Sequence, residues 1–210
     1  PKPIIQAYMR IQQTNPELFE LLPVVELVYY DLHIPKIPDT VSSKFVVHSE
    51  RMSERDYDQL MADCGLMICT SAAEGFCHAV NEGMSAECML LLSSIKPFSE
   101  ITNNAIWASS ARSVPHPECL GVLEDVDVGS LVEALTLYVN MTHHEKRSES
   151  RANRDRYESR HQKFLKTIEK AIQSVTEGLE EYSVEKTLPK EEDLPFISVF
   201  TISSDRRSFI

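Results

Sequence analysis

The sequence predicts an α/β protein in which helices flank a parallel β-sheet, and three neighbouring segments indicate this class. Leu66–Thr70 is a short apolar run typical of a buried strand. A turn of small residues, Ser71-Ala72-Ala73, follows, and Glu74-Gly75-Phe76 then opens an expected helix. Met89–Leu92 is a second apolar run. Strand, helix and strand in this order form a βαβ unit, whose parallel strands belong in a sheet covered by helices.

The segments before this unit also alternate between helix and strand patterns. Regularly spaced apolar residues predict a helix over Pro3–Asn15, which Pro16 is expected to end. Segments rich in Val, Tyr and Phe predict strands at Val24–Leu32 and Lys44–His48. Ser53 supplies an N-cap hydroxyl for the helix expected next.

The segments after the βαβ unit become helical and highly charged. Ser93–Glu100 is predicted to be a loop, and Ile106–Val114 one further short strand. Apolar spacing predicts a helix over Asp127–Asn140. Thr142–His161 mixes acidic and basic residues with i,i+4 pairs, which favours a solvated helix over an RNA-binding one. An amphipathic helix is expected to continue through Phe164–Val175.

Composition restricts the class of protein. The chain has 210 residues and a formal net charge of −11, which argues against a general binder of nucleic acids or anionic membranes. Its five cysteines lack C-x-x-C spacing, so a zinc site is not expected, and buried free thiols in a reducing compartment are the simplest interpretation. No apolar run is long enough to cross a membrane. We therefore expect a cytoplasmic location.

Two carboxylates in the βαβ unit indicate its chemistry. Glu74 lies at the turn and Glu82 eight residues later, a rise of roughly 12 Å if the intervening segment is helical. First-turn N–H groups near Gly75, Phe76 and Cys77 would lack intrahelical partners, and such groups favour an anion, in particular phosphate. Hydroxyl acceptors at two points, with diphosphate donors between them, match the ribose, diphosphate and hexose of a nucleotide sugar.

A purely structural interpretation of the same residues stays open. Ser71-x-x-Glu74 also fits a capping box, in which Glu74 satisfies a backbone N–H group. Glu82 also fits an ordinary solvated carboxylate on a helix surface. A glutamate pair at this spacing does not by itself distinguish the two interpretations.

A family resemblance adds to the argument from the carboxylates. Glu74-Gly75-Phe76 followed by Glu82-Gly83-Met84 resembles the E-x7-E motif of retaining glycosyltransferases with the GT-B fold, in particular glycosyltransferase family 4. The resemblance covers roughly residues 44–172. It implies a Rossmann-like parallel sheet flanked by helices, the C-terminal half of a GT-B fold, with a helical C-terminal region.

The resemblance also implies roles for individual residues. Glu74 would contact the donor sugar near the reacting carbon, as the catalytic residue, and Glu82 would hold the ribose hydroxyls. The amides around Gly75 and Phe76 would bind the phosphates. Ser71 and Cys77, at either end of the same loop, are included in the expected donor site.

Two basic residues are candidates for the donor site because of their positions. Lys96 follows the second strand of the βαβ unit, at the end where ligands bind in open α/β sheets, and is the best-placed cation for a donor phosphate. Arg51 lies in the loop that meets the nucleotide base or a phosphate in the resembled family. A solvated surface position stays the alternative for each.

The chain departs from the resembled family at two turns. The family usually has Gly where this chain has Cys77, and a Gly-x-Pro turn where this chain has Glu87-Cys88-Met89. The family also has a strand before the first helix, and that strand is absent here. Because the chain begins with Pro1 rather than Met, we expect it to be an excised piece, and the resemblance implies that the missing part includes the N-terminal half-domain of a GT-B fold.

The function implied by the resemblance is transfer of a sugar from a nucleotide-diphosphate donor to an acceptor hydroxyl with retention of configuration, in glycan or glycoconjugate biosynthesis. No cofactor or metal is expected, because helix-end amides and cations would stabilise the leaving diphosphate. Neither a nucleic acid partner nor a membrane span is expected. Two alternatives stay open: a nucleotide-sugar-binding domain without transfer activity, and a structural domain of a multidomain glycosyltransferase.

The C-terminal part of the chain changes character. We predict a nucleotide-sugar-binding domain over residues 1–178, a linker over 179–193 and the first strand of a further domain over 194–210. Leu194–Ile202 followed by Ser203–Arg207 resembles the opening of a GT-A domain of glycosyltransferase family 2. A strand that completes the preceding domain is the alternative.

Overall fold

A computed structural model describes residues 1–28, 36–115 and 122–183, with side chains described as far as residue 176. The chain forms two compact units, Pro1–Gln162 and Lys163–Ile210. The strand expected within 194–210, with its resemblance to a GT-A domain, lies outside the described residues. The predicted division at residues 178 and 193 therefore stays a prediction.

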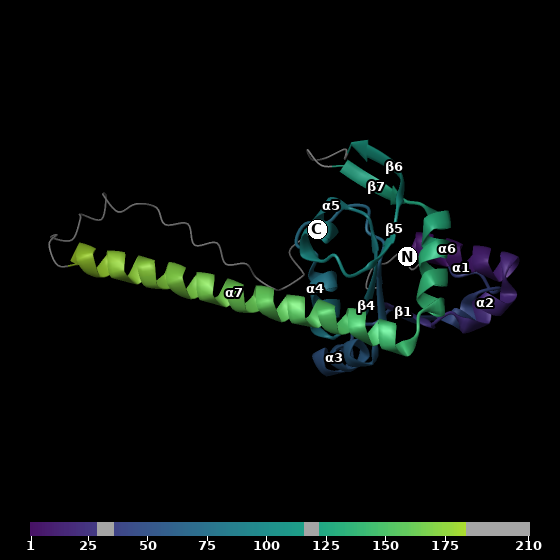
Figure 1. Ribbon diagram of the computed structural model, residues 1–210, viewed down its shortest axis with the longest axis horizontal. Helices are drawn as coiled ribbons and strands as arrows, with labels where there is room; N and C mark the ends of the chain where they lie inside the picture. Colours follow the sequence, from purple (N-terminus) through teal and green to yellow (C-terminus); the bar gives the residue numbers. More distant parts are fainter. Residues whose placement is uncertain (29–35, 116–121, 184–210) are drawn as a thin grey trace. The chain divides into compact units, whose positions relative to one another are not determined.

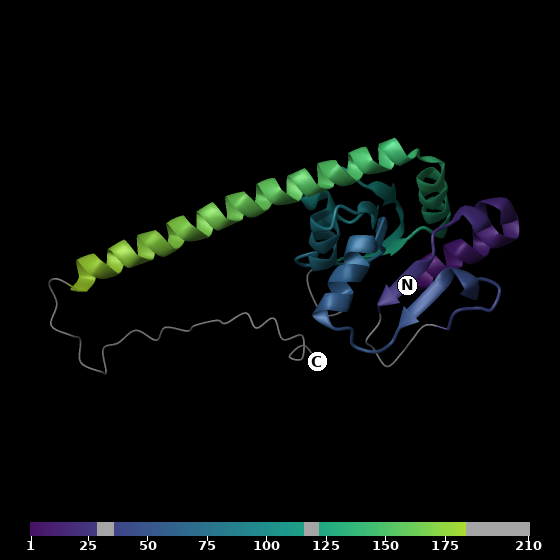
Figure 2. The same cartoon turned by 90° about the horizontal axis from the view of Figure 1, so that it is seen from below.

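The strands of the first unit form parallel sheets, as predicted, together with one antiparallel pair (Figures 1 and 2). The parallel strands are β1 (Val25–Val28) with β2 (Phe45–His48), and β3 (Leu66–Cys69), β4 (Met89–Ser93) and β5 (Ile106–Ala108) in that spatial order; the antiparallel pair is β6 (Ser110–Pro115) with β7 (Val122–Val126). Leu66 pairs with Met89 in a parallel register, which confirms the predicted βαβ unit. The α/β class is confirmed.

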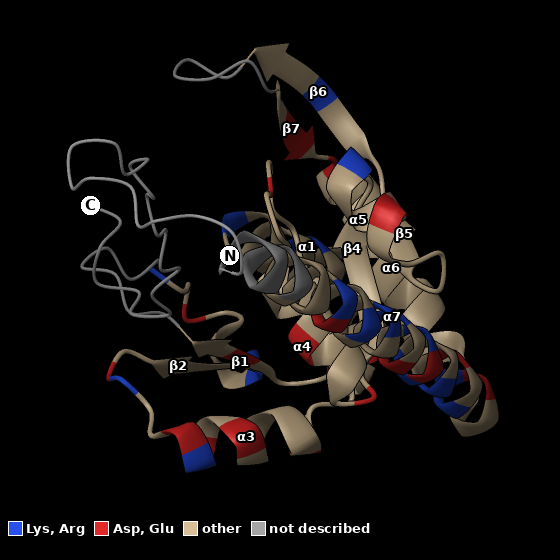
Figure 3. Cartoon of the chain, turned by 90° about the vertical axis from the view of Figure 1, so that its left-hand side faces the viewer, with Lys and Arg blue, Asp and Glu red and all other residues tan. Residues whose placement is uncertain are grey.

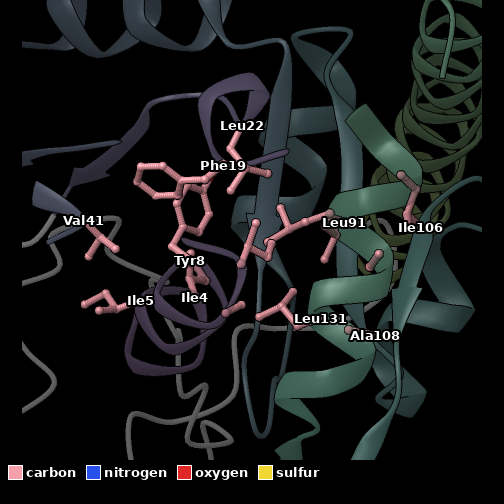
Figure 4. Close-up of a cluster of buried hydrophobic side chains, with 14 of the residues drawn as sticks. Ile4, Ile5, Tyr8, Phe19, Leu22, Val41, Leu91, Ile106, Ala108 and Leu131 are labelled. Carbon is pink, nitrogen blue, oxygen red and sulfur yellow. The ribbon is translucent and has the colours of Figure 1, made fainter. Parts of the chain in front are cut away.

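The larger hydrophobic cluster lies between the sheets and three helices (Figure 4). These helices are α1 (Lys2–Thr14), α2 (Pro16–Leu21) and α6 (Val128–Asn140). Tyr8 is fully buried, its ring lies 5.0 Å from that of Phe45, and its hydroxyl donates to Pro23 O at 2.9 Å. Leu91 of β4 and Leu131 of α6 belong to the same cluster. One core therefore supports both parallel sheets.

A second cluster covers the other face of β4. It contains Leu90 and Leu92, together with Val80 and Met84 of α4 (His78–Ser85) and Phe98 of α5 (Lys96–Ile101). All five residues of β4 are buried. A strand covered on both faces is apolar throughout rather than alternating, which explains why β4 was readily predicted.

The N-terminal part of α7 (His143–Ser183) is anchored to the first unit by polar contacts rather than solvated throughout. Asn153 is fully buried: Thr102 Oγ1 donates to its Oδ1 at 2.8 Å, and its Nδ2 donates to Asn104 O at 2.8 Å.

Two arginines of α7 bind the ends of other helices. Arg154 donates to Ser85 O, and Arg156 Nε donates to Ile101 O at 2.6 Å. Ser85 and Ile101 are the last residues of α4 and α5, where cations are favourable.

Acidic and basic residues are mixed along α7, whereas α3 (Glu54–Asp63) is mainly acidic, with Arg55 as its only basic residue, as Figure 3 shows. Beyond Gln162, α7 belongs to the second unit and carries exposed apolar side chains at Phe164, Ile168 and Ile172. The helix continues to Ser183, so residues 179–183 of the expected linker are helical.

Several short elements differ from the sequence predictions. The first helix ends at Thr14, just before Pro16 as predicted, but Asn15 also caps a second helix that was not predicted: its Oδ1 accepts from Leu18 N at 3.0 Å, and Pro16 occupies the first turn. The expected loop at Ser93–Glu100 contains α5, and the single strand expected at Ile106–Val114 is divided into β5 and β6. A 3-10 turn at Ser42–Lys44 and strand β7 were not predicted.

Candidate functional site

The loop that carries Glu74, the first glutamate of the E-x7-E motif, lies at the carboxyl ends of β3 and β4, the edge where open parallel sheets bind ligands. Ser71 and Glu74 follow β3, and the buried Ser93 ends β4. Ser93 Oγ donates to Ser71 O at 2.8 Å, which ties the two strand ends together. Glu124 N of β7 donates to Ala72 O at 2.8 Å, so the antiparallel pair holds the same loop from another side.

Glu74 is oriented by the serine three residues before it. Ser71 Oγ donates to Glu74 Oε1 at 2.6 Å, and both residues are half-buried. A capping box would require Ser71 to be the N-cap of the helix, but the N-cap of α4 is Cys77. The capping-box interpretation is therefore wrong, and Glu74 is an acceptor in a loop whose position is fixed by a side-chain hydroxyl.

Helix α4 begins at His78, four residues later than the predicted start at Glu74. Gly75 and Phe76 consequently lie before the helix and not in its first turn. An added Cβ at Gly75 would meet nothing within 4 Å, and Phe76 is 82% exposed. The predicted rise of roughly 12 Å between the two glutamates does not apply, because only part of the segment is helical.

Cys77 adopts an unusual backbone conformation at the start of α4. Its φ is 54°, in the left-handed region that non-glycine residues rarely occupy. Asn81 Nδ2 donates to Phe76 O at 3.3 Å and to Cys77 O at 3.1 Å, which holds this turn in place. Burial, followed by the negative charge of Glu74, raises the pKa of the Cys77 thiol to about 11, so it is a neutral side chain at physiological pH.

Glu87 has the same left-handed conformation at the other end of α4, with φ of 59°. Glu87 N donates to Met84 O at 3.2 Å, and Cys88 N donates to Gly83 O at 2.9 Å. These two bonds define a Schellman motif in which Glu87 occupies the position that usually holds glycine. Cys77 and Glu87 are the two non-glycine residues with positive φ in the part of the chain that the structure describes.

Glu82 is held by a residue that was not among the predicted site residues. Tyr57 of α3 donates its hydroxyl to Glu82 Oε2 at 2.6 Å, and both side chains are half-buried. Glu82 is therefore oriented and not merely solvated on a helix surface. Tyr57 was missed because helical spacing places it beside apolar positions, and only its hydroxyl distinguishes it from them.

The basic residues of the site are distributed over three segments. Lys96 is exposed in the first turn of α5, after β4, and Arg51 is exposed in the loop after β2. Neither forms an ion pair with another described residue. Arg160 of α7 was not predicted to contribute; it donates to Asn81 Oδ1 at 3.3 Å, beside the Cys77 turn. The sequence placed Arg160 only in a mixed-charge helix, which gives no signal for this contact.

Comparison with models of known protein families and with curated proteins finds no match. Among the described residues, no group of three or more His, Cys, Asp and Glu side chains is placed to hold a metal ion. None of the described helices combines the length and apolar character that crossing a membrane requires.

Proposed function

We propose that this chain is the donor-binding half of a retaining glycosyltransferase of the GT-B type. The observation that carries the proposal is the left-handed backbone at Cys77 and Glu87. These are the two positions at which the resembled family usually has glycine, and glycine adopts this conformation without steric penalty. The turns before and after α4 thus keep a glycine-type geometry although the glycines are replaced, which supports a common origin for the motif between them.

The arrangement of acceptors supports a ligand rich in hydroxyl groups. Glu74 and Glu82 each accept a short hydrogen bond from a neighbouring hydroxyl, so both carboxylates are oriented by the fold. In the proposal, Glu74 orients the donor sugar near the anomeric carbon and Glu82 holds the ribose. Lys96, Arg51 and Arg160 are the cations of this region for the diphosphate, since the amides of Gly75 and Phe76 precede the helix.

The proposed reaction transfers the sugar to an acceptor hydroxyl with retention of configuration. The acceptor oxygen attacks the anomeric carbon, the bond to the diphosphate breaks, and cations stabilise the charge on the leaving group. A hydroxyl acceptor from glycan or glycoconjugate biosynthesis and an N-terminal half-domain complete the proposal, with a cytoplasmic location. Because that half-domain would supply the acceptor surface, we expect the chain alone to bind donor weakly and to transfer little sugar.

A nucleotide-sugar-binding domain without transfer activity is the second candidate. The observation in its favour is that Tyr57 already occupies one oxygen of Glu82. A structural domain that binds no nucleotide is the third, and the contacts that α7 makes with α4 and α5 favour it.

Calorimetric titration of the full chain with UDP, GDP and their common sugars tests the proposal. We expect binding of one nucleotide at millimolar affinity or better, weakened at least threefold by Glu82→Ala. The matched control is Glu133→Ala, which removes an exposed carboxylate from α6 and should leave the affinity unchanged. Glu74→Ala should weaken binding of the nucleotide sugar more than binding of the free nucleotide, because the proposal assigns Glu74 to the sugar.

The outcomes separate the three candidates. Binding that is insensitive to Glu82→Ala would refute the assigned site. Binding of the nucleotide sugar together with an unchanged transfer rate in Glu74→Ala protein, measured with the N-terminal half-domain supplied, would favour the binding domain. If no nucleotide or nucleotide sugar binds even when the N-terminal half-domain is present, the structural domain is the candidate that agrees with the result.

A further inference from the structure

Two thiols meet at the junction between the α3–β3 and α4–β4 connections. Cys64 is the C-cap of α3, and Cys88 lies in the Schellman turn that ends α4. Cys64 Sγ donates to Leu66 O at 3.3 Å. Cys88 Sγ also contacts Met61 O at 3.9 Å, the same carbonyl oxygen that accepts from Cys64 N at 3.2 Å. The pair is therefore a defined local contact and not a coincidence of composition.

The strand register places these residues at a separation suited to a disulfide. Leu66 and Met89 are the first pair of the parallel ladder, and Met89 N donates to Gly65 O at 3.2 Å as part of that pair. The same register, continued by one residue before the ladder, places Cys88 opposite Gly65 and one residue diagonal from Cys64. Strands about 4.8 Å apart with a rise of about 3.3 Å give a diagonal of roughly 6 Å, within the usual Cα–Cα range of disulfides.

The two thiols differ in accessibility and in acidity. Cys64 is half-buried, whereas Cys88 is fully buried. The neighbouring thiol of Cys88 lowers the pKa of Cys64 despite the opposing effect of burial, and the thiol of Cys64, together with burial, raises the pKa of Cys88. Tyr138 of α6 is the third titratable group beside the pair, and burial followed by the two thiols raises its pKa, so it stays a neutral phenol.

The other described cysteines do not share this character. Burial raises the pKa of both Cys69 and Cys77, and the carboxylate of Glu74 acts in the same direction. A thiol that ionises less readily reacts more slowly as a nucleophile near neutral pH. Among the described cysteines, Cys64 is therefore the preferred attacking group.

We propose that Cys64 and Cys88 form a thiol–disulfide exchange site, with Cys64 as the attacking thiol and Cys88 as the resolving thiol, and with a low-molecular-weight disulfide such as glutathione disulfide as the oxidant. The Cys64 thiolate attacks one sulfur of glutathione disulfide, and one glutathione thiolate leaves. Cys88 then attacks the Cys64 sulfur of the mixed disulfide, its proton passes to the second departing glutathione, and an intrachain disulfide forms. Two protein thiols are oxidised, and one glutathione disulfide is reduced to two glutathione molecules.

The new bond would connect the C-terminal end of α3 to the turn between α4 and β4. Those helices carry Tyr57 and Glu82, so oxidation would fasten together the two elements that hold this hydrogen bond. The exchange site itself does not depend on the proposed glycosyltransferase function.

Incubation of the folded full chain with glutathione disulfide, followed by intact mass spectrometry and peptide mapping, tests the proposal. The wild-type chain should lose two hydrogens, about 2 Da, with one disulfide mapped to Cys64 and Cys88. Cys88→Ser should instead accumulate one glutathione adduct on Cys64, and Cys64→Ser should show neither product at this pair. Cys77→Ser is the matched control and should form the same disulfide as wild type.

Contradictory results are equally specific. Recovery of both thiols reduced in glutathione disulfide, under conditions that oxidise a reference dithiol, would overturn the proposal. So would a wild-type disulfide that maps to another pair, or a Cys88→Ser adduct distributed evenly over the remaining cysteines. Circular dichroism of each variant establishes that the chain is folded when it is treated.

Discussion

Replacement of Glu87 by glycine is expected to stabilise the folded chain by about 0.5 kcal/mol, although it removes an ion pair. Glu87 is the residue of the Schellman motif with φ of 59°. Its carboxylate lies 3.5 Å from Arg151 Nε, and the two side chains are 44% and 64% exposed. The prediction therefore weighs a backbone conformation against a surface charge contact.

Three contributions determine the magnitude. A left-handed conformation is less favourable for an L-residue by roughly 1–2 kcal/mol, which glycine avoids. Glycine loses roughly 0.5–1 kcal/mol more conformational entropy on folding than another residue. An ion pair as exposed as Arg151–Glu87 contributes roughly 0–1 kcal/mol, and its distance of 3.5 Å places it at the low end. The balance favours glycine.

Urea unfolding followed by the fluorescence of the single tryptophan measures this difference. Trp107 packs against the second cluster, so its environment changes on unfolding. For an m-value of about 2 kcal/mol/M, the midpoint should rise by roughly 0.3 M. Glu87→Ala is the matched control, because it removes the same ion pair and keeps the left-handed strain. The reasoning is refuted if Glu87→Gly is no more stable than Glu87→Ala at equal m-values.

Three further changes test other contacts. Tyr57→Phe should lower the free energy of unfolding by about 1 kcal/mol, because a half-buried carboxylate loses a 2.6 Å hydrogen bond; chemical denaturation measures this. Asn153→Ala should lower it by about 2–3 kcal/mol, because the fully buried amide satisfies a hydroxyl and a carbonyl; thermal and chemical unfolding check it. Cys88→Ala should raise the pKa of Cys64, so the pH profile of Cys64 alkylation by iodoacetamide should move to higher pH.

Each of these changes has a control on the same element or of the same chemistry. Tyr138→Phe removes a hydroxyl outside the Tyr57 contact and should change stability less than Tyr57→Phe. Ser159→Ala alters an exposed position of α7 and should leave stability within about 0.5 kcal/mol of wild type. Cys77→Ala should leave the Cys64 profile unchanged. Equal effects in a variant and its control would contradict the contact assigned to it.

The elements that sequence reasoning identified correctly are those whose pattern is set by burial. β4 is apolar because both of its faces are covered, and α1 and α6 show apolar spacing because each packs one face on the core. The elements it missed depend on a single local choice. Pro16 both follows one helix and begins the next, and α5 spans six residues, too few to establish a period.

The candidate site was predictable in position but not in detail. The βαβ order placed Glu74 and Lys96 at the carboxyl edge of the sheet, where the structure has them. The predicted start of α4 at Glu74 was wrong. The pattern Ser71-x-x-Glu74 does not reveal whether the serine hydroxyl binds a backbone amide or the carboxylate of Glu74 itself. Tyr57 could not be assigned to Glu82 from spacing, because that contact joins two helices.

The buried Asn153 is synthesised well after the residues that it contacts, and this affects how the chain folds during translation. Its partners Thr102 and Asn104 precede it by 51 and 49 residues, and Arg156 reaches Ile101 across 55. At a synthesis rate of roughly 5–20 residues per second, about 50 residues take roughly 3–10 s. During that interval the hydrophobic residues of the sheet have been synthesised, but Asn153 and Arg156, which contact the segment 101–104, have not. Ribosome-bound chains that end before Asn153 should therefore be proteolysed readily, and resistance should appear only once this part of α7 has emerged.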